Sequence, residues 1–392
     1  MFRSNPGSTS PAPRYACSAD SRGTLAHRRG ERTSEGVVRA LSWAIIAVLV
    51  STSAACARES VGPISVEWLA DPTPGVRAAV YQEHPTAITL TGGAEGHDTE
   101  ELRAVVYFPK EAAGKEHLIF LQHGGRQPCS DPGDSWPCRS ENVRTSSFLG
   151  FGYLGAALAA QGNVVVSISA NSTVGRADTD HSGDVFNRHT ALWRDWNRED
   201  SGPFGKLFTD QLDLASIGLI GHSRGGDAVA RYASGDAGPL PLLPISAMLL
   251  VAPVLPITGE LPALPEVPTV VTEGTCDGDV GRDPSGYVEV RHPYPQGNSV
   301  LITIAGANHN FFNTEWSPSN GRSNSIDDAD PTKNPHSPCT ATTPRLEETD
   351  QRTLAIDIAT TTFRAVETAS PIVAALSENL ANYQGVGITA FD

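Results

Sequence analysis

Several features that would assign the chain to a class at once are missing from it. No apolar run in the 392 residues approaches the ~20 that a membrane-spanning helix needs, because the most apolar stretch covers only residues 41–50. No segment repeats at a fixed spacing, which excludes a solenoid or a propeller. No two cysteines have the C-x-x-C spacing typical of zinc sites. We therefore expect a globular protein with no bound metal and no cofactor.

Positive charge is scarce as well. The chain has 29 lysines and arginines against 44 acids, which gives a net charge of −15. Residues 1–56 contain seven of the arginines and only three acids, so the residues after them carry a net charge of −19. Such an acidic surface argues against nucleic acid or anionic lipid as the main partner. The 39% hydrophobic content suffices for a large core, and we expect residues 58–392 to form a single domain that acts as a monomer.

The first 57 residues are typical of an export leader. Residues 1–36 are rich in Arg, Ser, Gly and Pro, and Arg39 then precedes the apolar core of residues 41–50. Small residues follow from Ser51 to Ala57. A basic residue, a short apolar core and a small-residue cleavage site together predict a secretory signal peptide. The long segment before it has two explanations: translation begins nearer Val37, or the whole segment is made.

Cys56 leaves two fates open for the exported chain. Small residues before a cysteine suit cleavage and lipidation, which would tether the protein to a membrane, although Ser53 stands where a lipoprotein signal usually has leucine. Ala55-Cys56-Ala57 equally provides an A-x-A site for ordinary cleavage. On either path the mature chain is expected to begin near residues 56–58 and to leave the cytoplasm, as an extracellular or envelope-associated protein.

Four cysteines of the mature domain are expected to form disulfides, because disulfides persist outside the cytoplasm. These are Cys129, Cys138, Cys276 and Cys339. Four cysteines allow three pairings, and proximity in sequence favours Cys129 with Cys138 and Cys276 with Cys339. In the chain-entropy model, closing these two loops stabilises the fold by about 3 and about 4 kcal/mol.

Strands and helices alternate along most of the domain. Residues 64–69, 87–90 and 102–108 have the pattern of antiparallel strands. Apolar strands are predicted at 118–121, 164–168, 212–220, 247–252, 269–272 and 299–304, with helices at 148–160, 191–196 and 227–232. This alternation predicts an α/β fold, with a mostly parallel central sheet, helices on both faces and antiparallel lead-in strands. A site is expected where the carboxyl ends of the parallel strands meet.

A G-x-S-x-G motif follows one of these strands. Apolar residues run up to Ile220, the motif is Gly221-His222-Ser223-Arg224-Gly225, and an amphipathic helix comes next. This context predicts a nucleophile elbow, a sharp turn between strand and helix that exposes the serine hydroxyl. Gly221 and Gly225 are expected to approach each other too closely for a Cβ on either. The alternative is a glycine-rich turn without chemistry, because a chain with 37 glycines can match the pattern by chance.

A second glycine-rich loop offers hydrogen-bond donors. The strand at 118–121 opens into Gln122-His123-Gly124-Gly125-Arg126. Backbone N–H groups in such a loop can stabilise an oxyanion, since glycine leaves them unobstructed. We expect the N–H of Gly125 or Arg126 to form an oxyanion hole with that of Arg224, the residue after the serine. His123 is expected to pack and hydrogen-bond within the loop rather than to react.

Acidic and histidine side chains follow the last two predicted strands. Residues 269–273 lead into a loop with Asp277 and Asp279, and residues 299–304 lead into a loop with His309. Since the carboxyl ends of neighbouring parallel strands meet, one of these carboxylates is expected beside the histidine. A serine, a histidine and a carboxylate are the groups of nucleophilic hydrolysis.

Together these motifs resemble the α/β-hydrolase superfamily over about residues 100–365. Gly221–Gly226 is similar to the lipase box of chlorophyllase-like and dienelactone-hydrolase-like secreted esterases, and the order Ser223, Asp277, His309 is that of the superfamily. The resemblance implies that Asp277, in a Gly-x-x-Asp turn, is the triad acid. The alternative is that Asp277 caps its own turn and Asp279 reaches the histidine.

The resemblance implies a serine hydrolase that cleaves small or polymeric carboxylic esters through an acyl-enzyme. An amidase, a peptidase or a thioesterase would use the same triad, and a non-catalytic relative would use the pocket only to bind. Such relatives usually lack a triad residue, whereas all three are present here. Residues 123–144 and 314–345 are not part of a minimal hydrolase, so no motif fixes the acyl or alcohol part of the substrate.

Overall fold

The computed structural model describes most of the chain after residue 62. The described residues are 13–15, 58–60, 63–83, 88–90, 99–131, 133–134, 136–139, 144–173, 179–200, 202–254, 262–280, 299–320, 339–340 and 342–391. Nearly all of the predicted leader, including Cys56, lies outside them. Among the described residues, no helix has the length and apolarity to cross a bilayer.

The chain divides into two units. The small unit, Pro11–Val61, contains β1 (Pro13–Tyr15) and β2 (Arg58–Ser60), which pair antiparallel. The large unit contains all the elements described below.

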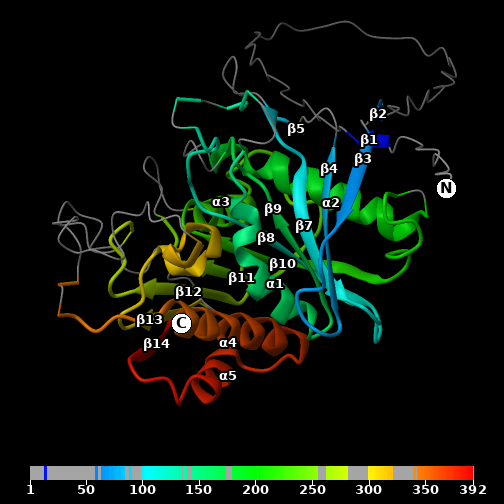
Figure 1. The fold of residues 1–392 in the computed structure, drawn as a ribbon. Helices are drawn as coiled ribbons and strands as arrows, with labels where there is room; N and C mark the ends of the chain where they lie inside the picture. The colour runs from blue at the N-terminus through cyan, green and yellow to red at the C-terminus, as the bar shows by residue number, and fades with distance from the viewer. Residues whose placement is uncertain are drawn as a thin grey trace, which may run out of the picture. The chain divides into compact units, whose positions relative to one another are not determined.

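A ten-stranded mixed sheet forms the centre of the large unit (Figure 1). In spatial order its strands are β14 (Val386–Phe391), β13 (Ser299–Ile304), β12 (Thr269–Gly274), β11 (Ile245–Val251), β10 (Leu212–His222), β8 (Glu116–Gln122), β9 (Asn163–Ile168), β7 (Arg103–Pro109), β4 (Val76–Glu83) and β3 (Ile64–Trp68). The strands from β13 to β9 are parallel to one another. At the edges, β14 on one side and β7, β4 and β3 on the other run antiparallel to their neighbours. The prediction of an α/β fold with a mostly parallel sheet is confirmed.

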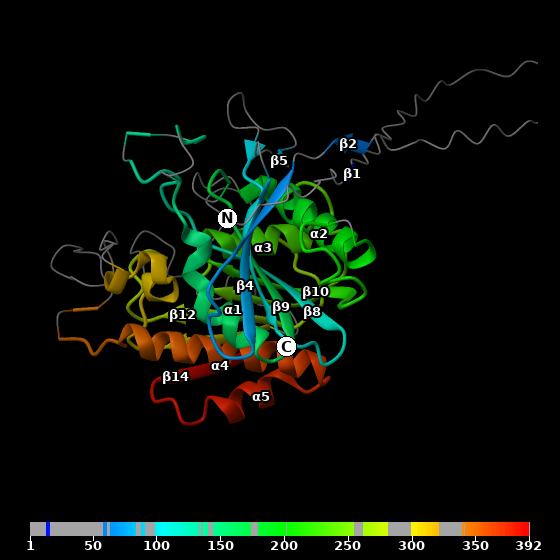
Figure 2. The same ribbon diagram turned by 45° about the vertical axis from the view of Figure 1, so that its right-hand side comes forward.

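Helices cover both faces of this sheet. They are α1 (Gly152–Ala159), α2 (Ser182–Arg198), α3 (Arg224–Ser234), α4 (Glu348–Glu367) and α5 (Ile372–Asn379). One core contains residues of α2 and α3, and the other contains residues of α1, α4 and α5. Figure 2 shows α4 and α5 below the strands and α2 and α3 above them.

The parallel strands are buried on both faces, which explains their continuous apolar sequences. Every residue of β9 is buried. Val164 and Val166 pack into the core with α2 and α3, while Val165 packs into the core on the opposite face. Neither face of the strand meets water, so alternation has no reason to appear.

The sequence prediction missed several elements. Strand β4 is buried along nearly its whole length, yet its apolar run is short, residues 78–81, and polar residues stand on both sides of that run. The predicted strand at 87–90 is only the short β5 (Ile88–Thr89), which pairs with β6 (Thr99–Glu100) outside the large sheet. The predicted helix at 191–196 is part of the C-terminal half of the longer α2. Helices α4 and α5 and edge strand β14 were not predicted.

Both predicted disulfides are present. Cys129 is bonded to Cys138, and Cys276 is bonded to Cys339. The pairing follows the proximity in sequence. Two disulfides are compatible with an exported protein, because thiols in the cytoplasm are kept reduced.

An aromatic cluster joins α2 to β4. The ring of Tyr81 lies edge-on to those of Trp193 and Trp196, with centroids 6.0 and 5.2 Å away. The Tyr81 hydroxyl accepts a hydrogen bond from Trp193 Nε1 at 3.1 Å and lies 2.7 Å from His189 Nδ1. We assign the hydroxyl as the donor to His189, because its proton then has an acceptor at an unprotonated Nδ1. Both tryptophans are core residues.

Buried neutral histidines should make the fold sensitive to acid. Burial, together with the charge of Arg188, lowers the pKa of His189 to about 3, and burial lowers that of His123 to about 4. The unfolded chain takes up these protons near pH 6.5, before the folded chain does. The stability that neutral histidines provide is therefore complete above about pH 6.5 and is lost as the pH falls toward 4.

We predict that the free energy of unfolding in urea decreases between pH 6.5 and 4.5, with up to ~1.4 kcal/mol per pH unit from each of these histidines. His189→Asn keeps an acceptor for Tyr81 but cannot titrate. It should therefore reduce the slope of the unfolding free energy against pH by the contribution of about one proton. A slope in this variant equal to that of the unmodified protein would contradict the assignment.

Candidate active site

Ser223 occupies the sharp turn between β10 and α3. Its backbone has φ 58° and ψ −126°, a conformation that residues with a Cβ rarely adopt. Such a conformation costs about 1–3 kcal/mol and persists only where its surroundings enforce it. Here the Ser223 N–H donates to the Val251 carbonyl at 2.9 Å, and the Ser223 carbonyl accepts from Gly226 at 2.9 Å and Val254 at 3.1 Å.

The glycines of the motif are required by close backbone approaches. A Cβ on Gly221 would lie 2.2 Å from the Gly225 carbonyl oxygen, as the sequence predicts. A Cβ on Gly225, however, would meet the carbonyl oxygens of Gln122 and His123, at 2.3 and 2.5 Å. A Cβ on either glycine therefore clashes, as the sequence predicts, and the absence of a Cβ on Gly225 also lets the loop after β8 approach the turn.

The loops after β12 and β13 place an aspartate against a histidine. Asp277 Oδ2 lies 2.8 Å from His309 Nδ1, and both side chains are buried. The other oxygen of Asp277 accepts from the backbone N–H groups of Asp279 and Val280, each at 2.9 Å. Asp277 therefore caps its own turn and also faces the histidine, so the capping half of the alternative is right, whereas the carboxylate bonded to His309 is that of Asp277 and not that of Asp279.

Asp279 has a different neighbour. One of its carboxylate oxygens accepts a hydrogen bond from Asn310 Nδ2 at 3.4 Å. Its side chain lines the cavity beside His309. A histidine Nδ1 bonded to a carboxylate carries its proton there, which leaves Nε2 as the basic nitrogen. Asp277 is therefore the residue that sets the tautomer of His309.

Four side chains hold the loop that carries His309. Gln351 of α4 accepts from the N–H of Asn308 at 3.0 Å and donates to its carbonyl at 2.8 Å. The carbonyl of His309 accepts a hydrogen bond from His222 Nε2 at 3.1 Å. The carbonyl of Phe311 accepts from Arg352 Nε at 3.0 Å, and that of Phe312 accepts from Tyr153 Oη at 2.9 Å. The histidine is thus fixed from the elbow, from α4 and from α1.

The loop after β8 lies directly against the serine. A Cβ on Gly124 would lie 2.5 Å from the Ser223 Cβ and 2.8 Å from the ring of Trp316. His123 holds this loop: its Nδ1 donates to the Gly124 carbonyl at 2.8 Å, and its Nε2 accepts from the Ala170 N–H at 3.0 Å. His123 therefore acts through hydrogen bonds within the loop, as the sequence analysis expected.

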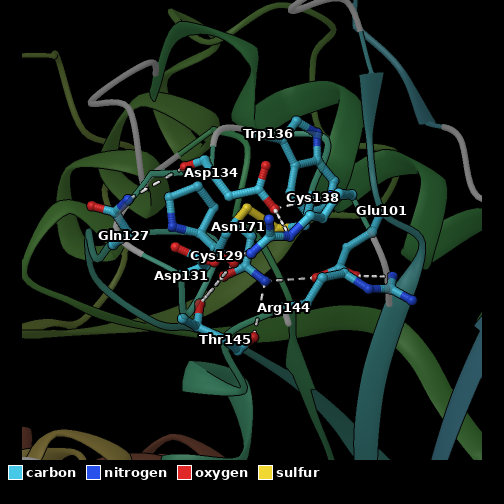
Figure 3. The surroundings of a disulfide bond; sticks show 12 residues. Glu101, Gln127, Cys129, Asp131, Asp134, Trp136, Cys138, Arg144, Thr145 and Asn171 are labelled. Atoms are coloured by element: carbon cyan, nitrogen blue, oxygen red, sulfur yellow. Dashed lines mark hydrogen bonds and ion pairs between the residues drawn. A yellow bond between two sulfur atoms is a disulfide. The ribbon is translucent and has the colours of Figure 1, made fainter. Parts of the chain in front are cut away.

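A buried polar network supports the same loop from the side of the first disulfide (Figure 3). Glu101 is fully buried, forms an ion pair with Arg144 and accepts hydrogen bonds from Ser169 Oγ and Asn171 Nδ2. Asn171 also donates to the Thr145 carbonyl at 3.0 Å. These contacts fix the segment after β9. That segment includes Ala170, whose N–H donates to His123 Nε2, so the network supports the Gly124 loop through His123.

The neighbouring carboxyl, Glu100, is buried in the same network. Its Oε2 accepts from the N–H groups of Ser172 and Thr173, at 2.7 and 2.8 Å. Burial and the adjacent Glu101 raise its pKa to about 8, against the effect of the three backbone N–H groups that it accepts from. Glu100 and Glu101 thus hold the same segment, residues 169–173. Glu100 binds its backbone N–H groups, and Glu101 binds its side chains.

The predicted site residues surround one cavity of about 450 Å³. Its lining consists of Gly125, Arg126, Gln127, Ser223, Arg224, Val254, Asp279, Val280, His309, Asn310 and Trp316. The predicted nucleophile, base and oxyanion-hole residues all belong to this set. Asp277 lies behind His309 and is 1% exposed.

Trp316 is a cavity residue that the sequence analysis missed. Its Nε1 donates to Ser147 Oγ at 3.0 Å, and its ring lies 5.1 Å from that of His222 and 6.5 Å from that of His309. The Arg126 guanidinium lies 5.7 Å from its centroid. Trp316 belongs to the stretch 314–345 that no hydrolase motif covers, so no pattern pointed to it.

Three residues with metal-ligating side chains also lie together, outside the set that lines this cavity. The ligand atoms of Cys129, Asp134 and Cys138 are within 4.8 Å of one another. The two sulfurs are bonded to each other, so neither can act as a thiolate ligand.

Comparison with known proteins adds no relative to this description. No protein-family model matches the chain, and no curated protein matches it either. The chemistry of the site must therefore be argued from its own residues.

We predict that Gly124→Ala lowers the free energy of unfolding by about 1–3 kcal/mol, because the added methyl group must displace Ser223 or Trp316. Gly114→Ala is the matched control, since a Cβ at this exposed glycine has no atom within 4 Å. The control should change stability by less than about 0.5 kcal/mol in urea unfolding. Equal stability of both variants would contradict the close packing of this loop on the elbow.

Proposed function

We propose that this protein is an exported serine hydrolase of the α/β-hydrolase superfamily that cleaves carboxylic esters. The observation that carries the proposal is the position of Ser223, in a strained strand-to-helix turn, on a cavity that it shares with His309. The hydrogen bond from His309 to the buried Asp277 supports it. These are the three groups that acyl transfer by a nucleophilic serine requires.

The first half-reaction forms an acyl-enzyme. As Ser223 Oγ bonds to the ester carbonyl carbon, its proton passes to His309 Nε2. Asp277 stabilises the imidazolium through Nδ1 and keeps the ring in the required orientation. The tetrahedral intermediate then breaks its bond to the alcohol oxygen, which leaves with the proton from His309.

Water completes the reaction. His309 removes a proton from a water molecule as its oxygen attacks the acyl carbon, and it returns that proton to Ser223 Oγ as the acid departs. No group beyond the triad, the substrate and water is needed to balance the protons.

Negative charge on the tetrahedral oxygen is stabilised by two elements. Arg224 is the first residue of α3, so its N–H lies at the positive end of the helix. Gly125 and Arg126 line the same cavity on the loop after β8. Losing one donor of this kind typically lowers the rate ~10²–10³-fold. The rigid support of the Gly124 loop is therefore part of the proposed catalysis.

The leader gives the proposal its location. A signal peptide in residues 1–57 would export the chain, and the two disulfides fit that route. A lipid on Cys56 would tether the enzyme to the membrane, whereas cleavage after it would release the enzyme.

Three variants test the proposal with short p-nitrophenyl esters as substrates. Ser223→Ala should abolish turnover at unchanged folding, since the nucleophile is lost. Asp277→Asn should lower kcat by about 10⁴-fold, because the amide favours the wrong tautomer of His309. Asp279→Asn is the matched control: its carboxylate faces Asn310, so kcat should fall by less than about tenfold.

Two results would count against the assignment. Turnover by Ser223→Ala at the level of the unmodified protein would exclude Ser223 as the nucleophile. A larger loss in Asp279→Asn than in Asp277→Asn, with both variants equally stable in urea, would reassign the triad acid.

A further inference from the structure

His222, the residue before the nucleophile, makes a contact that the proposed chemistry does not yet use. It is fully buried at the end of β10, and its Nε2 lies 3.1 Å from the carbonyl oxygen of His309. A carbonyl only accepts, so the imidazole is the donor and carries its proton on Nε2. One hydrogen bond therefore connects the chain at the nucleophile directly to the chain at the base.

Burial keeps this imidazole neutral. It lowers the pKa of His222 well below its usual value, and the nearby His309 lowers it further against the effect of the bonded carbonyl. The ring centroid of His222 lies 4.7 Å from that of His309 and 5.1 Å from that of Trp316. The ring centroids of Phe151 and Phe312 lie 5.8 and 5.9 Å from that of His222, so apolar rings surround the imidazole and keep water from the hydrogen bond.

Packing alone does not explain a histidine at this place. Its Nδ1 is buried and has no hydrogen-bond partner among the described residues. Burying an unpaired polar atom costs free energy because the atom loses its hydration, a cost that a phenylalanine or leucine would avoid. The Nε2–H donor is the feature that an apolar residue could not supply.

We propose that His222 is a positioning residue, whose Nε2–H holds the His309 backbone at a fixed distance from Ser223. We call this hydrogen bond from His222 to the His309 carbonyl the clamp. Gln351 of α4 fixes Asn308, the residue before His309, so the clamp and α4 together leave the His309 backbone little freedom. Displacement of a reacting group by about 1 Å can lower a rate ~10²-fold. The inference rests on the proposed hydrolase function.

Two variants of equal length separate the donor from the packing. In His222→Gln, the side-chain Nε2 is the same number of bonds from Cβ as the imidazole Nε2 and can donate to the His309 carbonyl. His222→Met has the same reach and an apolar end. Active sites are counted by covalent labelling with a fluorophosphonate, and kcat and KM for a short p-nitrophenyl ester are measured per labelled site.

We expect His222→Met to lose about 10- to 100-fold in kcat with KM changed by less than about threefold, because substrate binding does not involve His222. His222→Gln should restore kcat to within about fivefold of the unmodified protein. Thermal unfolding of both variants is followed in parallel, since a merely structural role would lower stability and leave kcat per labelled site unchanged.

Two results would overturn the clamp: wild-type kcat per labelled site in His222→Met, or equal losses in the methionine and glutamine variants. Failure of the hydrolase proposal looks different. In that case the unmodified protein itself shows no turnover that depends on Ser223.

Discussion

The structure depends on the close backbone contacts around Ser223. The carbonyl of Gly225 lies close to Gly221, and the carbonyls of Gln122 and His123 lie close to Gly225. Gly124 lies against Ser223 itself. Each contact excludes a methyl group, and together they hold Ser223 at φ 58°. The strain of that conformation, about 1–3 kcal/mol, is offset by the packing and hydrogen bonds around it. Every other part of the proposed active site is placed relative to this turn.

Buried polar groups connect the remaining loops to the elbow. His123 holds the Gly124 loop, and the Glu101–Arg144 network fixes the segment on which His123 depends. His222 and Gln351 hold the loop of His309, while Asp277 fixes the ring itself. Such networks are costly when incomplete, because each buried polar atom that lacks a partner loses its hydration. Their presence on three sides of one cavity explains how loops, rather than regular elements, can keep reacting groups in place.

Local patterns in the sequence were enough for part of this description. The apolar runs predicted the parallel strands, the G-x-S-x-G motif predicted the turn, and the spacing of cysteines predicted both disulfides. Contacts between distant segments were beyond reach. Gln351 holds Asn308 across 43 residues, and Trp316 joins the cavity from a stretch without a motif. Strand β4 was missed because its apolar run is short and half alanine, and because the sheet around it also buries the polar Gln82 and Glu83. Gln351 is buried on α4, a helix that the sequence did not predict, so the support behind His309 was not foreseen.

The central claim is that the elbow exposes the hydroxyl of Ser223 and that His309 makes it nucleophilic. Treatment of the mature protein with a fluorophosphonate, followed by proteolysis and mass spectrometry, tests it without knowledge of the substrate. The account predicts one phosphonate on the peptide that contains Ser223, and a rate of labelling that falls at least ~10²-fold in His309→Ala, because an unassisted serine reacts slowly. Absence of labelling at Ser223, or labelling that is independent of His309, would contradict the account.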